Sequence, residues 1–270
     1  MASLDKLDTS VVLRIVGVFG LIFLVAPLVL VVPISFAGES ILSFPPQQWS
    51  FGAYERLFSN SAWYIPVGRS FLIATLSSFI STTIGLIGAY SLFLVSKRYR
   101  TLIIGLLLLP LLLPPVVIGV GQLFFFARLG LVDTIPGLVF SHILLSMPFA
   151  LLICCAGLGR ADLHLEDVAC SFGAIRLYAF IRVTLPQIWS ALGASLLLTF
   201  VISFDEPVIA MFLAPSNAKT LPRKLFDCIR YDLDPVAAAV AVLLMLLSIF
   251  VGLVIIKRMS RVTILNTGIK

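Results

Sequence analysis

Two adjacent acids, Asp205 and Glu206, are unusual because they lie within a long apolar run, residues 187–213. A charged side chain at the centre of a membrane costs about 2.5–3.5 kcal/mol on insertion scales, so acids in such a run usually have a function. A helix rises about 1.5 Å per residue, which places both acids toward the far end of this run. Two carboxylates there could attract or pass a cation. Alternatively, they are solvated at a helix end or paired with Arg223 or Lys224.

Two further polar residues, Gln122 and His142, also lie within apolar runs. Either could contact a solute that crosses a membrane, and a hydrogen bond across two helices is the ordinary alternative for the histidine. The two histidines of the sequence lie in different regions, and its four cysteines do not have the spacing of metal ligands. We therefore predict no catalytic residue and no metal site.

Composition places the whole chain in a membrane. Of its 270 residues, 60% are hydrophobic and 12% are charged, against about 25% charged in an ordinary soluble domain. Such a chain cannot surround one core with a solvated surface, so lipid must cover much of it. At about 20 apolar residues per span there is room for about five to seven helices, and none for a separate soluble domain. The net charge of +6 then belongs to the loops and does not indicate a nucleic-acid partner.

The apolar runs predict an all-α membrane protein with one transmembrane domain over residues 1–270. The expected spans lie near residues 11–35, 68–95, 101–126, 135–158, 187–213 and 235–257. If the amino terminus is cytoplasmic, twelve Lys and Arg residues fall on the cytoplasmic side and seven on the other. Basic loops favour the cytoplasm, so we predict that both termini lie there.

Prolines interrupt the third expected span. Pro110, Pro114 and Pro115 remove backbone donors and clash with the preceding turn, so this helix should bend or partly unwind. A broken helix at mid-depth commonly lines the path of a transporter. A kink that neighbouring helices absorb is the alternative.

The loop at residues 159–186 is long, mixed in polarity and helical in pattern. Leu163 to Phe172 can form a short helix, and Gly173 can adopt the left-handed conformation that ends it. A second short helix, residues 175–184, should follow, with Pro186 in the first turn of the fifth span. Leu165, Val168 and Phe172 share one face of the first helix, and an exposed apolar stripe of this kind requires a partner.

This loop resembles a known signature. The binding-protein-dependent importer permeases carry a cytoplasmic Glu-Ala-Ala motif, a glycine four residues after its second alanine, and an Ile-x-Leu-Pro ending. The chain has Asp167-Val168-Ala169, then Gly173, then Val183-Thr184-Leu185-Pro186, at matching spacing. It departs from the pattern by Asp for Glu, Val for Ala and Val for Ile, and Glu166 keeps an acid before the motif. The chain thus looks like the permease subunit of a type I ATP-binding-cassette (ABC) importer of a bacterial inner membrane.

The resemblance implies a coupling helix that sits in a cleft of a separate ATPase. It assigns this coupling role to Glu166, Asp167, Val168, Ala169, Phe172, Gly173, Leu185 and Pro186. It also implies two ATPase subunits, which bind ATP and magnesium, and a periplasmic solute-binding protein. A second permease completes the pair; a homologous but different chain is expected, and a second copy of this chain is the alternative. The chain has no phosphate-binding loop of the Gly-x-x-x-x-Gly-Lys type, so we expect it to bind no cofactor.

Residues 49–58, 203–209 and parts of the fourth span are similar to those of polyamine-type permeases. The resemblance therefore implies spermidine, putrescine or a related cation as the solute. Opines, other amines, ferric iron and phosphonates stay open, because their importers share much of the pattern. The role of the loop at residues 215–234 also stays open. It either contacts the binding protein or is simply a solvated loop.

Two other classes of protein fit the composition less well. A secondary transporter would need titratable relays within the membrane rather than a coupling loop. A membrane-embedded enzyme would need clustered histidines or acids at one depth.

Overall fold

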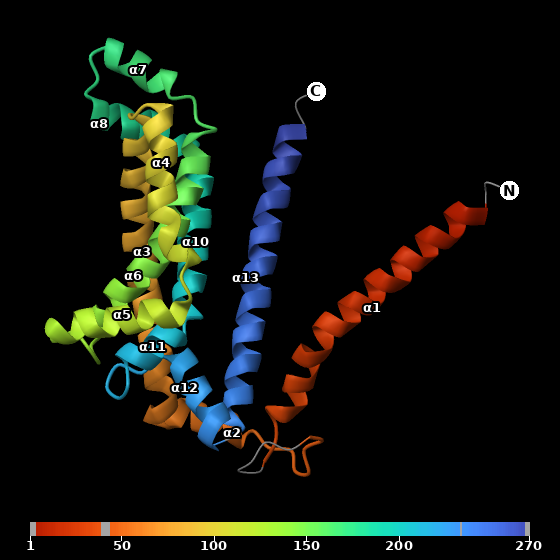
Figure 1. Cartoon of the computed structure of the whole chain (residues 1–270). Helices are drawn as coiled ribbons and strands as arrows, with labels where there is room; N and C mark the ends of the chain where they lie inside the picture. Colours follow the sequence, from red (N-terminus) through yellow and green to blue (C-terminus); the bar gives the residue numbers. More distant parts are fainter. Residues whose placement is uncertain (1–3, 39–43, 233, 268–270) are drawn as a thin grey trace. The chain divides into compact units, whose positions relative to one another are not determined.

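The computed structural model describes residues 4–38, 44–232 and 234–267. Their regular structure is helical (Figure 1), apart from an isolated bridge between Ala37 and Trp49, and this confirms the predicted all-α class. The helices are α1 (Leu4–Ile34), α2 (Gly52–Ser59), α3 (Ser61–Phe93), α4 (Lys97–Leu108), η1 (Leu109–Leu112), α5 (Pro115–Arg128), α6 (Ile135–Leu158), α7 (His164–Ser171), α8 (Arg176–Ala179), η2 (Phe180–Thr184), α9 (Leu185–Gln187), α10 (Trp189–Phe204), α11 (Val208–Leu213), α12 (Leu221–Asp227), η3 (Cys228–Asp232) and α13 (Val236–Thr267).

Four helices, α1, α3, α6 and α13, are long and apolar enough to cross a membrane. Two bent pairs qualify if each counts as one span: residues 98–112 with α5, at an angle of 94°, and residues 176–187 with α10, at 75°. Helices satisfy every backbone polar group within one segment, which is why lipid selects them. Four to six spans therefore agree with the prediction of about six.

The fifth predicted span is interrupted more than the sequence suggested. The chain bends at Ile188 before α10 begins, and α10 ends at Phe204. Asp205, Glu206 and Pro207 separate it from the short helix α11. The run from 187 to 213 is therefore a helix and a half-helix with two acids at the break.

The described residues form two compact units, and the second of them, residues 65–226, contains the elements discussed below. Hydroxyl groups join its central helices: Ser81 of α3 and Ser146 of α6 are 2.8 Å apart. Thr82 of α3 and Ser195 of α10 are 3.0 Å apart. Such hydrogen bonds between helices replace the hydrophobic driving force that lipid does not supply.

Small residues let these helices approach closely. A Cβ atom at Gly85 of α3 would lie 2.7 Å from the Cβ of Ala150 on α6, which no side chain tolerates. A Cβ at Gly157 of α6 would likewise lie 2.6 Å from the Cβ of Ala191 on α10. Gly85 thus allows α3 and α6 to pack backbone against backbone, and Gly157 lets α10 place the methyl group of Ala191 against α6.

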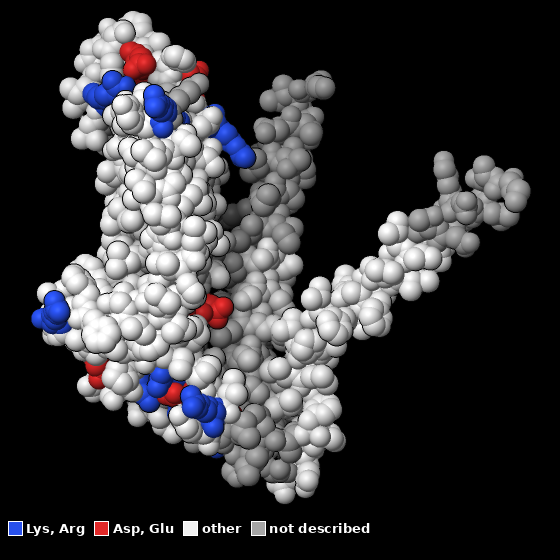
Figure 2. Space-filling model, viewed as in Figure 1, with Lys and Arg blue, Asp and Glu red and all other residues white. Residues whose placement is uncertain are grey.

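Apolar side chains fill the two ends of this bundle. One buried cluster gathers around Leu138, Ile209 and Leu213, and a second around Leu151, Leu158 and Ile188. In Figure 2 the charged side chains of this unit lie mainly toward its two ends, and most of the surface between them is uncharged. That distribution is the one expected of a bundle surrounded by lipid.

The first unit contains residues 4–38, 44–64, 227–232 and 234–267 of the described chain. Its aromatic loop packs the ring of Phe36 against Phe51 and Tyr54, with ring centroids 5.3 and 5.4 Å apart. Arg56 of α2 pairs with Asp234 just before α13, at 3.4 Å. Helix α2 was not predicted from the sequence.

Candidate functional site

The loop at residues 159–186, called the knuckle below, folds into α7, α8, the π-helical turn η2 and α9. Gly173 ends α7 with φ +93°, the left-handed conformation that the sequence suggested. The N–H of Ala174 donates to the carbonyl of Ala169, and the N–H of Gly173 donates to that of Cys170. These two bonds form a Schellman motif, which satisfies carbonyls that the end of a helix leaves free. The knuckle therefore has a defined corner.

One face of the knuckle is apolar and exposed. Leu165 and Val168 of α7 are about half exposed, and Phe172 is 89% exposed. Asp167, the first residue of the signature, is also exposed and lies 3.4 Å from Arg176 of α8. Ala169 is partly buried beneath this face. The residues that the signature assigns to coupling thus surround an apolar surface that can receive a partner.

Glu166 points the opposite way and is buried, with 1% of its surface exposed. Its two carboxylate oxygens accept hydrogen bonds from the hydroxyls of Tyr90, near the end of α3, and Thr184, the last residue of η2. The guanidinium of Arg176 lies 3.3 Å away. Burying an unpaired carboxylate costs several kcal/mol, whereas a hydrogen bond to a charged group contributes about 1.5–3 kcal/mol. These three partners are what permit the burial of Glu166.

The roles of Tyr90 and Thr184 were not predicted from the sequence. Tyr90 is 76 residues from Glu166 along the chain, and no local spacing relates them. Thr184 lies in the ending Val-Thr-Leu-Pro, where the pattern treats its position as variable. The available signal was the position of Glu166 itself, which lies off the face formed by Leu165, Val168 and Phe172.

The knuckle passes into the membrane bundle through Leu185 and Pro186. Pro186 occupies the first turn of α9, where its missing N–H costs little. Leu185 is partly buried and packs against the cluster around Leu158 and Ile188. The chain then bends by 75° and continues as α10.

The predicted proline break lies between α4 and α5. Residues 109–112, which include Pro110, form a 3₁₀ turn, and Pro114 and Pro115 precede and begin α5. The two halves meet at 94°. Helix α5 then packs against α11, where a Cβ at Gly119 would lie 2.7 Å from the ring of Phe212. Two broken spans therefore contact each other through their half-helices.

The adjacent acids at the second break have different surroundings. The carboxylate of Glu206 accepts a 2.9 Å hydrogen bond from the N–H of Ile209, so it caps the amino terminus of α11. Asp205 follows the last residue of α10 and is exposed. Its carboxylate has no ion-pair or hydrogen-bond partner among the described side chains of residues 65–226. Neither acid is paired with Arg223 or Lys224 in this range.

His142 and Gln122 are both buried. His142 Nδ1 lies 2.7 Å from the hydroxyl of Ser203 on α10, so the histidine bonds across two helices. Gln122 lies in the wall of an apolar cavity of about 470 Å³ beside Pro110 and Pro148. Its Oε1 accepts no hydrogen bond from the described part of the chain. The structure places Gln122 at the proline break and His142 beside the end of α10.

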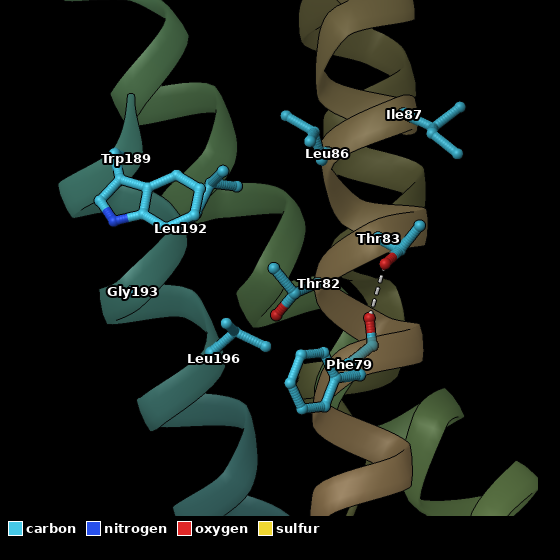
Figure 3. Close-up of a pocket in the computed structure, with 9 residues that line it drawn as sticks. All are labelled: Phe79, Thr82, Thr83, Leu86, Ile87, Trp189, Leu192, Gly193 and Leu196. Atoms are coloured by element: carbon cyan, nitrogen blue, oxygen red, sulfur yellow. Dashed lines mark hydrogen bonds between the residues drawn. The ribbon is translucent and has the colours of Figure 1, made fainter. Parts of the chain in front are cut away.

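A second apolar hollow lies between α3 and α10 (Figure 3), with a volume of about 260 Å³. Phe79 and Leu86 of α3 face Trp189 and Leu196 of α10 across it. The hydroxyl of Thr83 in its wall donates to the carbonyl of Phe79 in its own helix, at 2.8 Å. This hollow has almost no polar lining, unlike a site that recognises a charged solute.

Asp133, between α5 and α6, organises the loop that follows α11. Its carboxylate accepts hydrogen bonds from the N–H groups of Ser216, Asn217 and Ala218, at 3.2, 2.8 and 3.0 Å. Partial burial raises the pKa of Asp133, but these donors outweigh it and hold the pKa below its usual value. Asp133 was not predicted from the sequence, whose pattern indicated only the later loop at residues 215–234.

The described residues contain no group of three or more His, Cys, Asp or Glu side chains that could hold a metal ion. The candidate functional features are the knuckle, the two broken spans and the acids between α10 and α11.

Comparison with known proteins decides the family. The family model described as "Binding-protein-dependent transport system inner membrane component" matches residues 81–263, which include the knuckle and both breaks. The chain belongs to this family. The resemblance drawn from Asp167 to Pro186 is therefore confirmed, and the chain is a non-catalytic permease subunit of a binding-protein-dependent ABC importer, a multi-pass protein of the inner membrane.

Several relatives of this permease are similar over most of its length. The spermidine/putrescine transport system permease protein PotC of Escherichia coli K12 is 25% identical over 227 residues, 84% of this chain and 86% of PotC. The putrescine transport system permease protein PotI of the same strain is 28% identical over 242 residues, 86% of this chain and 84% of PotI. A Haloferax volcanii protein named "Probable molybdenum ABC transporter permease protein" is 32% identical over 196 residues, 70% of this chain and 72% of that protein.

The fold of the permease also matches a solved structure. A bacterial ABC transporter involved in the import of the acidic polysaccharide alginate contains a chain with a TM-score of 0.72 and 16% identity. The match covers 95% of this permease and 98% of that chain.

Proposed function

We propose that this permease forms one half of a membrane channel that a separate ATPase opens and closes through the knuckle. One of two ATPase subunits, which carry ATP and magnesium, would bind the exposed face of α7, and a second, homologous permease would form the other half of the channel. A periplasmic binding protein would deliver the solute from the opposite side. In this arrangement the knuckle and both termini lie in the cytoplasm.

The exposed Phe172 carries the docking part of the proposal. An aromatic ring with 89% of its surface exposed at the corner of the knuckle is costly in water and favourable at an interface. Phe172→Glu should abolish co-purification of the ATPase while the permease still accumulates in the membrane. Phe58→Glu on α2, where the ring is also mostly exposed, is the matched control and should retain the ATPase. Equal loss in both variants would contradict docking at the knuckle.

We propose a small organic cation of the polyamine type as the solute. Support comes from the relatives PotC and PotI, whose names state spermidine and putrescine and which align over 84% and 86% of this chain. Asp205 adds a physical reason, because an exposed carboxylate at the break of a span attracts a cation. The two broken spans, which contact each other through α5 and α11, would line the path.

The relative named for molybdenum supports a second candidate, an importer of a metal oxyanion. Its identity of 32% is higher, but it covers a smaller part of this chain, 70%. The carboxylate of Asp205 disfavours an anion, since like charges repel within a membrane. We therefore rank the cation first. A secondary transporter, which needs no ATPase, is not compatible with the family.

Ligand binding to the partner binding protein tests the solute. Isothermal titration with spermidine, putrescine and molybdate should give tight binding to a polyamine and none to molybdate. Binding of molybdate alone would favour the second candidate. Failure of all three would direct the search to opines, other amines, ferric iron or phosphonates, and would contradict the polyamine proposal without affecting the family.

A further inference from the structure

We propose that Glu166 is a positioning residue that fastens the knuckle to two spanning segments, so that movement of the knuckle is transmitted to both. Its side chain contacts Tyr90 of α3 on one side and Thr184, just before α9 and α10, on the other. The proposal rests on the proposed function, because it presumes that the ATPase moves α7. It assigns to Tyr90 and Thr184 a role that the signature does not give them.

The direction of the side chain excludes direct contact with an ATPase. Glu166 is 1% exposed, whereas its neighbour Asp167 lies on the outer surface. A partner that sits on Leu165, Val168 and Phe172 therefore meets Asp167 and cannot reach Glu166. Asp167 therefore belongs to the contact with the partner, and Glu166 belongs to the attachment of α7 to the bundle.

A carboxylate suits this attachment because it has two acceptor oxygens. One oxygen accepts from Tyr90 and the other from Thr184, so a single side chain bridges segments that are 94 residues apart. Arg176 of α8 contacts Glu166 and Asp167 at 3.3 and 3.4 Å, and thereby links the inner attachment to the outer face. A shift of the knuckle must therefore either move α3 and the segment that leads into α10 or break these hydrogen bonds.

The segment on the Thr184 side is unusual in itself. Residues 180–184 form a π-helical turn, a form that is rare and is often found at functional sites. The turn begins at Phe180, whose ring meets that of Tyr90 edge to face, with centroids 4.6 Å apart. Tyr90 thus holds both the carboxylate, through its hydroxyl, and η2, through its ring.

The test uses the complete complex in proteoliposomes, with the second permease, the ATPase and the binding protein. Uptake of radiolabelled spermidine and hydrolysis of ATP are measured on the same vesicles, and the amount of assembled complex is measured separately. Tyr90→Phe removes one hydroxyl and leaves the ring on Phe180, and Thr184→Val removes the other hydroxyl at nearly constant volume. The matched controls are Tyr99→Phe, at an exposed tyrosine of α4, and Thr83→Val, whose hydroxyl donates to the carbonyl of Phe79 in its own helix.

Tyr90→Phe and Thr184→Val should each lower spermidine uptake per ATP hydrolysed by about tenfold or more, as expected when one hydrogen bond to a buried charge is lost. The controls should keep the wild-type ratio. The double variant should lose less than the product of the two single losses, because either change breaks the same bridge. Ratios in Tyr90→Phe and Thr184→Val that equal those of the controls would overturn the proposal.

Substitutions of Glu166 itself keep the test valid if one variant fails to assemble. The amide of Gln can form hydrogen bonds with the hydroxyls of both Tyr90 and Thr184, whereas Ala can form neither bond. Glu166→Gln should therefore retain more coupling than Glu166→Ala. The reverse order would also overturn the attachment. A wild-type complex whose hydrolysis does not respond to the binding protein would instead contradict the proposed function, which separates the two failures.

Discussion

The imidazole Nδ1 of His142 on α6 lies 2.7 Å from the hydroxyl of Ser203 in the last turn of α10. This contact fixes the end of α10 directly before the break that carries Asp205. Hydrogen bonds between helices in a membrane contribute about 0.6 kcal/mol on average and about 1.7 kcal/mol at most. The histidine is therefore a structural tie beside the proposed path.

A double-mutant cycle tests this tie. His142→Leu and Ser203→Ala should each lower the thermal stability of the solubilised permease, with a coupling energy of about 0.6 kcal/mol between them. Uptake per assembled complex should stay near the wild-type value. A large loss of uptake in His142→Leu with unchanged stability would instead make the histidine a contact of the solute.

The acids at the second break should respond differently to neutralisation. Asp205→Asn should lower uptake of a polyamine and leave the amount of folded permease unchanged, because no described side chain of residues 65–226 pairs with this carboxylate. Glu206→Gln keeps an acceptor for the N–H of Ile209 and should be mild, whereas Glu206→Ala should destabilise the permease by about 0.5–2 kcal/mol. Membrane abundance and uptake are measured together. Unchanged uptake per complex in Asp205→Asn would remove its role in transport.

Substitutions of Gly173 test the corner of the knuckle. The space around its α-carbon is open, so the cost arises from φ +93° and not from a clash. A left-handed conformation costs an L-residue about 1–2 kcal/mol, and a β-branched side chain more. Gly173→Asn should therefore be tolerated best, Gly173→Ala should be intermediate, and Gly173→Val should uncouple ATP hydrolysis from uptake. Full transport in Gly173→Val would show that the corner does not need its shape.

The stability provided by Asp133 should depend on pH. Because its pKa is lowered in the folded protein, this stability is fully present above the unfolded value of about 3.9 and is lost as pH falls through the folded pKa. Asp133→Ala leaves three N–H groups without their acceptor and should cost about 1–3 kcal/mol at pH 7. Thermal unfolding of both forms over a range of pH is the measurement. A difference that does not shrink below about pH 4 would contradict an ionised Asp133 as its cause.

Apolar run length was enough to predict the helices that cross a membrane without a break. The predicted span at residues 135–158 coincides with α6, Ile135–Leu158. The break at Pro110 and Pro114 was also visible, because proline has a local effect on the backbone. The bend at Ile188 was not, since isoleucine does not interrupt a helix and the bend depends on how the knuckle packs.

Local spacing predicted the exposed half of the knuckle and missed its buried half. Leu165, Val168 and Phe172 share a face through helical periodicity alone. The attachment of Glu166 to Tyr90 depends on how α3 and α7 meet, and no pattern within either segment encodes that meeting. The cap that Glu206 provides was missed for another reason: an acid inside an apolar run was not recognised as the start of a new helix.

Gly85 and Ala150 have a consequence for how the subunit can move. Where two helices touch backbone to backbone, neither can rotate or slide without a steric clash, because a packed interior has few alternative arrangements. We therefore expect α3 and α6 to move together, with any bending of the spans at the breaks Pro110–Pro114 and Asp205–Pro207. A methyl group added at Gly85 should therefore push α3 away from α6 and leave the two breaks unchanged.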